Sequence, residues 1–382
     1  MAATSGTRST RSTGTRAATP RTPRSGPAPV LVRQVRSGVV ESVHRGDIVE
    51  VDAAGRMLHA LGDPDRVVNL RSTVKPFGLV ALLREGGQAE FDLTGEELAL
   101  MTSSHSGEDL HVRTLQALYR RLQLPQTVLA CGTDGAPLDA LTAARLARDG
   151  ERPSPWRHMC SGNHTVIVLL AKLGGWPLDT YWQPDHPAHV QFAAAVAAVY
   201  GVKPDKLQTG IDGCGILTYA FPLRSVARAF AMLADPDAIP AGDPRAGLAP
   251  HLTVVRDAMR RHPELVAGTR DRLDTSLVKA VDGRVAAKSG MEGLRGIAIL
   301  PGARGDGSSA SGMAIKIEDG DGFDRGSSAA TVEALRQTGV LDGQALRSLA
   351  RYHRPIDTDP HGRMAGEAIP EFELAPVGEL IG

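Results

Sequence analysis

Apolar and polar residues alternate along the first part of the chain, starting at Val30, with the period of two that favours β-strands. Glycine-containing turns separate the alternating runs, which is typical of a strand meander. The runs cover residues 30–33, 39–44, 48–51 and 57–60. The same alternation returns near the C-terminus, at residues 284–288, 296–300 and 312–317. We therefore expect strands at both ends of the chain.

Between these ends the apolar residues follow the longer period of an α-helix. Residues 76–84 predict a buried helix that opens just after Thr73. Thr94 stands before two glutamates, as an N-cap followed by acidic residues in the first helical turn. Further helical stretches are predicted at residues 111–122, 190–200 and 325–337.

This distribution predicts an α+β fold, in which the N- and C-terminal strands form one antiparallel sheet and helices flank it. The middle of the chain is expected to be mainly helical. We expect one folded unit over residues 29–382, with a sheet part at 29–70 and 280–382 and a helical part at 71–279. A site is expected in the cleft between the two parts.

The composition of the 382 residues excludes several classes of protein. Lys and Arg total 43, and Asp and Glu total 43, so charge gives no case for nucleic acid or an anionic membrane as the main partner. No run approaches the length of about 18 apolar residues that a transmembrane helix needs. A small-molecule substrate is the expectation that remains.

Residues 1–28 carry five arginines among small and polar residues, with no acidic residue and no apolar run. We expect a disordered basic tail rather than a secretory signal, because such a segment has almost nothing to bury. The three cysteines, Cys131, Cys160 and Cys214, are too few and too far apart for a disulfide framework. A reducing compartment, the cytoplasm, is therefore predicted.

Ser72 and Lys75 form an S-x-x-K motif at the expected start of the first helix, where residues three apart share a face. The lysine amine is expected to reach the serine hydroxyl, which needs an adjacent base to act as a nucleophile. Only seven of the 43 basic residues are lysines. Because a guanidinium does not deprotonate in proteins, this rarity marks Lys75 and Lys288 as candidates for proton transfer.

Lys288, Ser289 and Gly290 end a predicted strand and resemble the K-T-G element beside S-x-x-K sites in serine β-lactamases. Such a strand can supply a cation and a backbone N–H to a reacting centre. An ordinary strand end with a turn is the alternative interpretation. Ser104 lies in a hydroxyl-rich segment and is a candidate for a second hydroxyl that passes protons. A capped helix junction explains that segment equally well.

Two glycine-rich segments each carry a cysteine, Cys160 before His164 and Cys214 after Asp212. Together they could bind a soft metal such as zinc, although neither has the C-x-x-C or H-x₃-H spacing of common zinc sites. A cysteine nucleophile is the other interpretation, but no nearby cation in the sequence argues for a lowered thiol pKa. Spacing alone favours neither.

Together these motifs resemble the type II asparaginase family typified by the Rhizobium enzymes, whose fold is similar to that of serine β-lactamases and glutaminases. The resemblance covers nearly the whole chain after the basic tail, and its segments stand in the order of the family. They are residues 71–75, 103–108, 160–164, 185–187, 212–214 and 288–293.

The resemblance implies two Ser-Lys couples, Ser72 with Lys75 and Ser104 with Lys288, that convert L-asparagine to L-aspartate and ammonia. Ser72 would attack the amide carbon, Lys75 would accept its proton, and backbone N–H groups would stabilise the oxyanion. A homodimer is also implied. Substrate binding is assigned within the same segments, to Arg71, His105, Asp212, Gly213, Ser289, Gly290 and Glu292.

A zinc ion is implied as well, held by Cys160, Cys214 and a lysine at whose position this chain has Asn163. An amide oxygen is a weak zinc ligand compared with thiolate or imidazole. We therefore expect no required cofactor, with zinc an optional ion that two thiolates plus Asp212 or water would hold weakly.

Three alternative functions stay open. A glutaminase or broader amidase differs by one methylene in its substrate, worth only about 1–3 kcal/mol of discrimination. A β-lactam-reactive serine hydrolase shares both lysine motifs, but the chain has no S-D-N element and we expect no export signal. A non-catalytic relative that binds a metal or an amino acid is consistent with Asn163, but such a protein has no need for two serine-lysine pairs.

Overall fold

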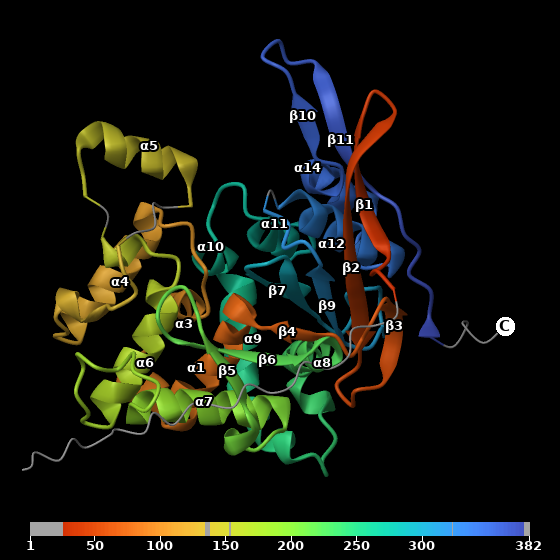
Figure 1. Ribbon diagram of the computed structural model, residues 1–382. Helices are drawn as coiled ribbons and strands as arrows, with labels where there is room; N and C mark the ends of the chain where they lie inside the picture. Colours follow the sequence, from red (N-terminus) through yellow and green to blue (C-terminus); the bar gives the residue numbers. More distant parts are fainter. Residues whose placement is uncertain (1–25, 134–137, 153, 323, 378–382) are drawn as a thin grey trace, which may run out of the picture.

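The computed structural model describes residues 26–133, 138–152, 154–322 and 324–377 (Figure 1). These residues form an α+β fold, in which an eight-stranded antiparallel sheet lies beside a group of helices. The strand order is β10-β11-β1-β2-β9-β8-β7, and β3 pairs with β2. Strands from both ends of the chain therefore pair in one sheet, which confirms the predicted fold class.

Six strands of this sheet occupy the predicted alternating runs, and the two nearest the C-terminus, residues 356–358 and 364–370, were not predicted. The predicted runs 39–44 and 48–51 are one strand, because Gly46 and Asp47 between them stay paired with β9. The strands are β1 (Val30–Arg36), β2 (Val39–Val51), β3 (Met57–Leu61), β7 (Val285–Gly290), β8 (Leu294–Ile299), β9 (Ser311–Ile317), β10 (Ile356–Thr358) and β11 (Met364–Pro370).

Most of the expected basic tail, residues 1–25, lies outside the described residues. Its last residue differs from the expectation. Ala28 is buried, and its carbonyl accepts a hydrogen bond of 3.0 Å from the Arg45 guanidinium. Ala28 is therefore part of the fold rather than of the tail.

The helices include those that the sequence predicts. Residues 76–84, 111–122, 190–200 and 325–337 correspond to α1, α4, α7 and α12, and Thr94 caps α3 through a reciprocal pair of hydrogen bonds with Glu97. The α-helices are α1 (Lys75–Arg84), α2 (Gly87–Glu90), α3 (Gly95–Met101), α4 (Asp109–Arg121), α5 (Ala140–Asp149), α6 (Ser161–Leu173), α7 (Pro187–Tyr200), α8 (Leu223–Ala234), α9 (Ala249–Arg261), α10 (Pro263–Val266), α11 (Leu273–Ala280), α12 (Arg325–Gln337), α13 (Gly343–Ser348) and α14 (Ala350–His353).

Short 3₁₀ helices connect several of these elements. They are η1 (Arg71–Val74), η2 (Gln126–Val128), η3 (Pro155–Arg157), η4 (Pro204–Lys206), η5 (Pro236–Ala238) and η6 (Pro244–Leu248). No helix in the described part of the chain is both long and apolar enough to cross a membrane.

The two faces of the large sheet are covered by different helices. Ile297 and Ile315 point to one face, where they share a core with α11 and α12. Their neighbours Ala298 and Ala314 point to the other face and belong to the core that contains α8. Because side chains alternate along a strand, Lys288 on β7 points to the same face as Ala286, toward the helical part.

Two glycines allow α8 to lie directly on the sheet. A Cβ atom on Gly312 of β9 would lie 2.1 Å from the carbonyl oxygen of Ala227. One on Gly296 of β8 would lie 2.0 Å from the ring of Phe230. The two layers are therefore held at a spacing that only glycine permits, which fixes the helical part relative to β7 and its lysine.

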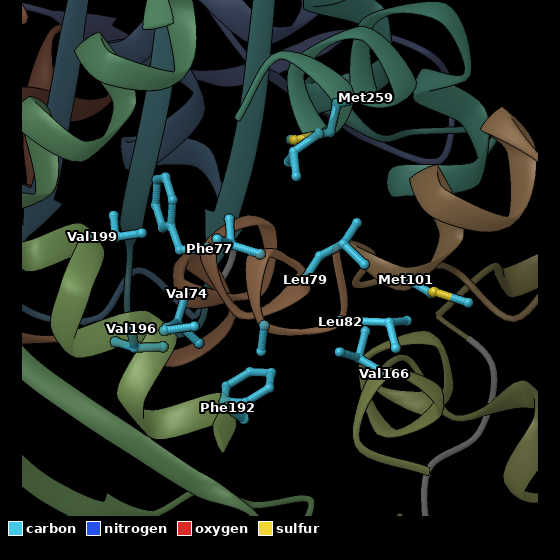
Figure 2. Packing of buried hydrophobic residues seen from close by; sticks show 14 of the residues in the cluster. Val74, Phe77, Leu79, Leu82, Met101, Val166, Phe192, Val196, Val199 and Met259 are labelled. Atoms are coloured by element: carbon cyan, nitrogen blue, oxygen red, sulfur yellow. The ribbon is translucent and has the colours of Figure 1, made fainter. Parts of the chain in front are cut away.

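Helix α1 runs through the centre of the helical part (Figure 2). Its residues from Lys75 to Leu83 are all buried, because α3, α6, α7 and α9 surround it. Figure 2 shows Phe77 and Leu79 of α1 between Phe192 of α7 and Met259 of α9. A helix that is apolar on every side has little freedom to shift, so the residues at its start are held firmly.

Two strands of a second, three-stranded sheet lie within residues 71–279, which the sequence predicts to be mainly helical, and its third strand lies just before them. Its order is β4-β6-β5, with β4 (Val67–Asn69), β5 (Gln208–Ile211) and β6 (Leu217–Pro222). These strands are too short for a clear period of two, which explains why they were not predicted. Strand β4 leads directly into η1 and α1.

Candidate active site

Ser72 lies in η1, between the small sheet and the central helix α1. The preceding residue, Arg71, has a φ of 45°, a left-handed conformation that costs a non-glycine residue about 1 kcal/mol or more. Two hydrogen bonds hold the turn: Leu70 N to Tyr219 O at 2.7 Å and Arg71 N to Thr218 Oγ1 at 3.1 Å. The small sheet thus presents Ser72 to a cavity of about 600 Å³, which Ser104, Ser289 and other residues also line.

Lys75 begins α1 and is buried under the cavity. Its Nζ donates hydrogen bonds to Ser103 O at 2.8 Å and to Ser104 Oγ at 3.0 Å. A third contact of 3.2 Å reaches Cys160 Sγ. Three acceptors therefore satisfy the three N–H groups of the ammonium.

Ser104 follows α3 and is only 5% exposed. Its backbone N–H donates to Val266 O at 3.0 Å, which fixes the segment after α3. Its Oγ lies 3.0 Å from Lys75 Nζ and 3.0 Å from Lys288 Nζ. One hydroxyl therefore connects two buried amines, one from a helix and one from a strand.

Lys288 has no exposed surface and donates a second hydrogen bond of 2.6 Å to Ser289 O. Burial lowers the pKa of the Lys288 amine well below its usual range, and the nearby Lys75 amine lowers it further. The carboxylate of Asp274 acts in the opposite direction but does not cancel these effects. Lys288 therefore loses its proton more readily than an exposed lysine does, which suits it to act as a proton acceptor.

This geometry differs in one respect from the expected pairing. The hydrogen bond between Ser104 and Lys288 is present, but Lys75 Nζ forms no hydrogen bond to Ser72 Oγ in the part of the chain that the structure describes. Lys75 instead extends toward the end of α3, because the carbonyl of Ser103 and the hydroxyl of Ser104 are accessible acceptors inside the protein. Direct activation of Ser72 by Lys75 stays a prediction.

The end of β7 is held by a carboxylate that the sequence did not single out. Asp274 Oδ2 accepts hydrogen bonds from the backbone N–H and the hydroxyl of Ser289, both at 2.8 Å. Its other oxygen pairs with Arg295, which is also buried. Burial alone would raise the pKa of Asp274, but the charges of Arg295 and Lys288 lower it. This carboxylate positions the strand that carries Lys288.

Gly290 ends β7 directly over η1. A Cβ atom on Gly290 would lie 3.0 Å from Leu70 O and 3.2 Å from Thr73 Cγ2, so only a glycine fits without displacement. Both Ser289 and Gly290 line the cavity, as predicted for substrate-binding residues. The strand end and the serine turn thus lie side by side and line the same cavity.

Arg71, Asp212 and Glu292 come together at the rim of the site. Arg71 Nε donates to Asp212 Oδ1 at 2.9 Å, and Arg71 NH1 lies 4.0 Å from Glu292 Oε1. The backbone N–H of Gly213 also donates to Asp212 Oδ1, at 2.6 Å. Of these residues Glu292 lines the cavity, while Arg71, Asp212 and Gly213 stand behind it.

His105, like Arg71, Asp212 and Gly213, was predicted to bind substrate but does not line the cavity. It is fully buried, its Nε2 lies 2.7 Å from Ser161 Oγ, and its Nδ1 accepts from Gly107 N at 3.0 Å. Burial lowers the pKa of His105 well below its usual range. Because it is not among the cavity-lining residues, its contacts indicate support of the Ser104 segment rather than contact with substrate.

Arg272 lines the cavity and was missed by the sequence analysis. Its NH2 group donates to Ser104 O at 3.0 Å, and it has no ion pair within 4.0 Å among the described residues. Only its place in a run of alternating charges just before a helix could have drawn attention to it. The cavity lining contains charges of both signs, from Arg270, Arg272, Arg295, Glu292, Asp139, Asp271, Asp319, Asp321 and Asp324. Such a lining suits a ligand that carries both an ammonium and a carboxylate.

Cys160 and Cys214 are free, buried and in contact beside Lys75. A hydrogen bond from the Cys214 thiol lowers the pKa of Cys160 well below its usual range, with the Lys75 charge acting in the same direction. The same bond, together with burial, raises the pKa of Cys214. Cys160 therefore gives up its proton more readily than Cys214, and its sulfur also accepts a hydrogen bond from Lys75.

The donor set for zinc is incomplete in the described residues. Asn163 is buried one turn after Cys160, and its Oδ1 has no hydrogen-bond partner there. No group of three His, Cys, Asp or Glu side chains that could hold a metal occurs among the described residues. Structural zinc sites use four strong ligands. Two thiols and one amide oxygen fall short of that set, so the residues present do not fit a firmly bound zinc ion.

The chain is an amidohydrolase, as comparison with known families indicates. A family model described as L-asparaginase II matches residues 32–370. The chain belongs to this family. No curated protein sequence matches the chain.

Two solved structures resemble the chain at low identity. A probable glutaminase from Bacillus subtilis, complexed with 6-diazo-5-oxo-L-norleucine, is 12% identical, with 80% of this chain and 87% of that chain covered and a TM-score of 0.38. A Bacillus glutaminase in the presence of 4.3 M NaCl is 12% identical, with 77% and 91% covered and a TM-score of 0.39. TM-scores this low carry no argument about the site or its substrate.

Proposed function

We propose that the protein hydrolyses the side-chain amide of L-asparagine to L-aspartate and ammonia through an acyl-enzyme formed on Ser72. The observation that carries the proposal is the chain of hydrogen bonds Lys75–Ser104–Lys288, with both links at 3.0 Å, under the cavity that Ser72 lines. The match of the chain to the L-asparaginase II family supports the same reaction.

Before the first half of the reaction, the Lys75 ammonium passes one proton through Ser104 to Lys288, so that Lys75 becomes a neutral base. Ser72 Oγ then forms a bond to the amide carbon, the carbonyl π electrons move to its oxygen, and the Ser72 proton passes to Lys75. The carbon–nitrogen bond then breaks, and the leaving nitrogen takes a proton from Lys75 and departs as ammonia. In the second half, water attacks the acyl carbon and its proton returns to Ser72 through the same amine. Aspartate leaves, and the serine and the lysine are both restored.

This sequence requires Lys75 to turn from Ser104 toward Ser72 when substrate is present. Both groups lie at the start of one buried helix, three residues apart, and a lysine side chain can cover that separation by rotating its methylene torsions. Contacts of catalytic groups commonly tighten only when the substrate is bound.

Ser104 and Lys288 serve as a proton relay in this scheme. A hydroxyl can accept a hydrogen bond from one amine and donate a hydrogen bond to a second amine, provided that the second amine is neutral. The lowered pKa of Lys288 gives the relay its neutral end. A proton can thus be stored at Lys288 while Lys75 exchanges protons with Ser72 and the leaving group.

Arg272 is proposed to hold the α-carboxylate of the substrate, and Glu292 to hold the α-ammonium. The guanidinium of Arg272 lines the cavity without an ion pair to a described residue, and its one hydrogen bond goes to a neutral carbonyl. A carboxylate ligand would complete its coordination. Glu292 lies at the rim near Arg71, on the far side of Gly290.

No step of the mechanism passes through a metal. The side chains of Cys160 and Cys214 already form a hydrogen bond with each other, and the amide of Asn163 is a weak third ligand. Their proposed role is electrostatic: a thiolate at Cys160 stabilises the ammonium form of Lys75 at 3.2 Å. The homodimer and the cytoplasmic location stay predictions, and the three free cysteines support the second of them.

The proposal is tested by measuring ammonia release from L-asparagine and L-glutamine side by side, together with hydrolysis of a penicillin. We expect asparagine to have the highest kcat/KM. A higher value for glutamine would contradict the substrate assignment but not the mechanism. No release from either amide, together with acylation by the penicillin, would favour a β-lactam-reactive enzyme instead.

A further inference from the structure

A second cavity, of about 650 Å³, lies apart from the active site and shares none of its lining residues. It is formed where the C-terminal ends of α1 and α7 meet α8 and η6. Its size is within the range of about 300–1,000 Å³ typical of small-molecule sites. The polar side chains that line it are those of Arg84, Tyr200, Lys203, Arg228, Asp243 and Arg245.

The single carboxylate of this cavity is already fully engaged. Asp243 accepts hydrogen bonds from Arg245 Nε at 2.7 Å and from Arg245 NH2 at 2.5 Å. It also accepts from Arg228 NH2 at 2.9 Å and from the backbone N–H of Arg245 at 2.9 Å. The hydrogen bond from Arg245 lowers the pKa of Asp243 to about 2, so the carboxylate stays ionised. It therefore offers little to a further ligand.

The remaining groups around the cavity are donors. Arg84 and Lys203 form no ion pair with any described residue, although both line the cavity. The Tyr200 side chain is 7% exposed, and its buried hydroxyl has no hydrogen-bond partner within the described residues. Burial and the neighbouring Arg245 lower the pKa of the Arg228 guanidinium, which indicates that these cations repel one another. The cavity thus has excess positive charge and unused hydrogen-bond donors.

We propose that this second cavity binds a small molecule that carries a phosphate group. A phosphate group has several acceptor oxygens and close to two negative charges at neutral pH, which matches a lining rich in donors and cations. Arginine side chains suit it well, because their N–H groups pair with phosphate oxygens in fixed geometry. The cavity is larger than a phosphate ion, so the remainder of a phosphate ester fits beside the anion.

The binding site is tested by isothermal titration calorimetry on the full chain at constant ionic strength, with AMP, inorganic phosphate and adenosine as probes. We expect AMP to bind, adenosine not to bind, and the double variant Arg84→Gln/Lys203→Gln to weaken AMP binding by about tenfold or more. Both side chains are exposed at the cavity, so their replacement leaves the core intact. A tighter Kd for AMP than for phosphate identifies an ester as the ligand class, and equal values identify the free anion.

The matched control is the double variant Arg120→Gln/Lys206→Gln. It removes the same two charges, from the last turn of α4 and from a position three residues after Lys203, and neither side chain lines the cavity. We expect this control to bind AMP as the parent does. Absence of AMP binding by the parent, equal affinities of both double variants, or adenosine binding as tightly as AMP would each overturn the proposal.

Discussion

The two cavities lie at opposite ends of one buried helix, and they use cations in different ways. At the start of α1, Lys75 and Lys288 are buried and share one serine hydroxyl. At its end, Arg84 and Lys203 are exposed and line the second cavity. Burial beside another amine makes a lysine a proton acceptor, whereas exposure leaves it a binding charge. The environment, rather than the residue type, decides the role.

The charged residues that line the two cavities also differ. The first cavity combines guanidinium groups with carboxylates such as the exposed Glu292, which suits a zwitterionic amino acid. In the second cavity the one carboxylate, Asp243, is occupied by two arginines, which leaves donors only. The first is therefore proposed to bind and convert a neutral amide, and the second to hold an anion without chemistry.

The largest expected effect is on activity, and it distinguishes the buried Lys288 from the exposed Lys203. Lys288→Arg keeps the positive charge but cannot become neutral, so we expect kcat/KM for asparagine to fall by about 10²–10⁴-fold. Lys203→Arg should leave both activity and AMP binding close to those of the parent, because only charge is needed there. Lys172→Arg, in the last turn of α6 and outside both cavities, is a control for the exchange itself. Steady-state kinetics of the three variants make the comparison, and an active Lys288→Arg enzyme would refute the relay.

The second effect concerns the two arginines. Arg272→Gln is expected to raise KM for asparagine by about 10–100-fold with little change in kcat, because it removes a charge-assisted bond to the bound carboxylate. Arg84→Gln should not change KM. If Arg272→Gln lowered kcat and left KM alone, Arg272 would act on Ser104 through its hydrogen bond to the carbonyl rather than on the substrate.

The third effect is on stability and depends on pH. The pKa of Lys288 in the folded chain lies below its ordinary value of 10.5, so between these two pKa values the unfolded chain binds one more proton than the folded chain. This group therefore destabilises the fold more as pH falls through that window. Lys288→Met removes the penalty, so we expect its melting temperature to exceed that of the parent by a margin that grows toward lower pH.

Melting curves of the parent and of Lys288→Met across neutral and alkaline pH test this sign. A margin that shrinks toward lower pH would mean that Lys288 is charged and stabilised by Asp274 in the fold. The same variant of Lys203 gives the contrast, since an exposed amine should produce no such pH dependence.

The smallest effect concerns zinc. A strong chelator is expected to change the activity of the parent by less than about twofold, because two thiols and an amide hold zinc weakly. Asn163→His adds an imidazole beside Cys160 and Cys214 and should increase the zinc content of the purified protein. Metal analysis by mass spectrometry measures this. Stoichiometric zinc in the parent, with activity lost on chelation, would show that the donor set has been judged wrongly.

Much of the fold could be predicted from the sequence, because its signals are local. Six of the eight strands of the large sheet alternate in polarity, α1 is an apolar run that follows a turn, and α12 has a helical period. Strands β10 and β11 were not predicted. The three-stranded sheet could not be predicted, since β4 and β5 are short and take their place only through pairing with β6. Packing of distant segments, rather than propensity, forms that sheet.

The candidate site likewise contains residues that could be predicted from the sequence and residues that could not. Ser72, Ser104 and Lys288 could be found because each stands in a short motif. The direction of the Lys75 side chain depends on the acceptors at the end of α3, and the importance of Arg272 depends on which carboxylates reach it. No local pattern contains that information. The second cavity was the feature least accessible from the sequence, since its cations come from four separate segments.

The central claim is that Ser72 is the nucleophile and that Ser104 is held in the relay. It is tested most directly by treating the enzyme with the diazoketone analogue of asparagine, which alkylates a nucleophile in the site, and mapping the modified peptide by mass spectrometry. The account predicts one label, on the peptide that contains Ser72, and none in a Ser72→Ala variant. A label on Ser104 or on Cys160 would contradict it.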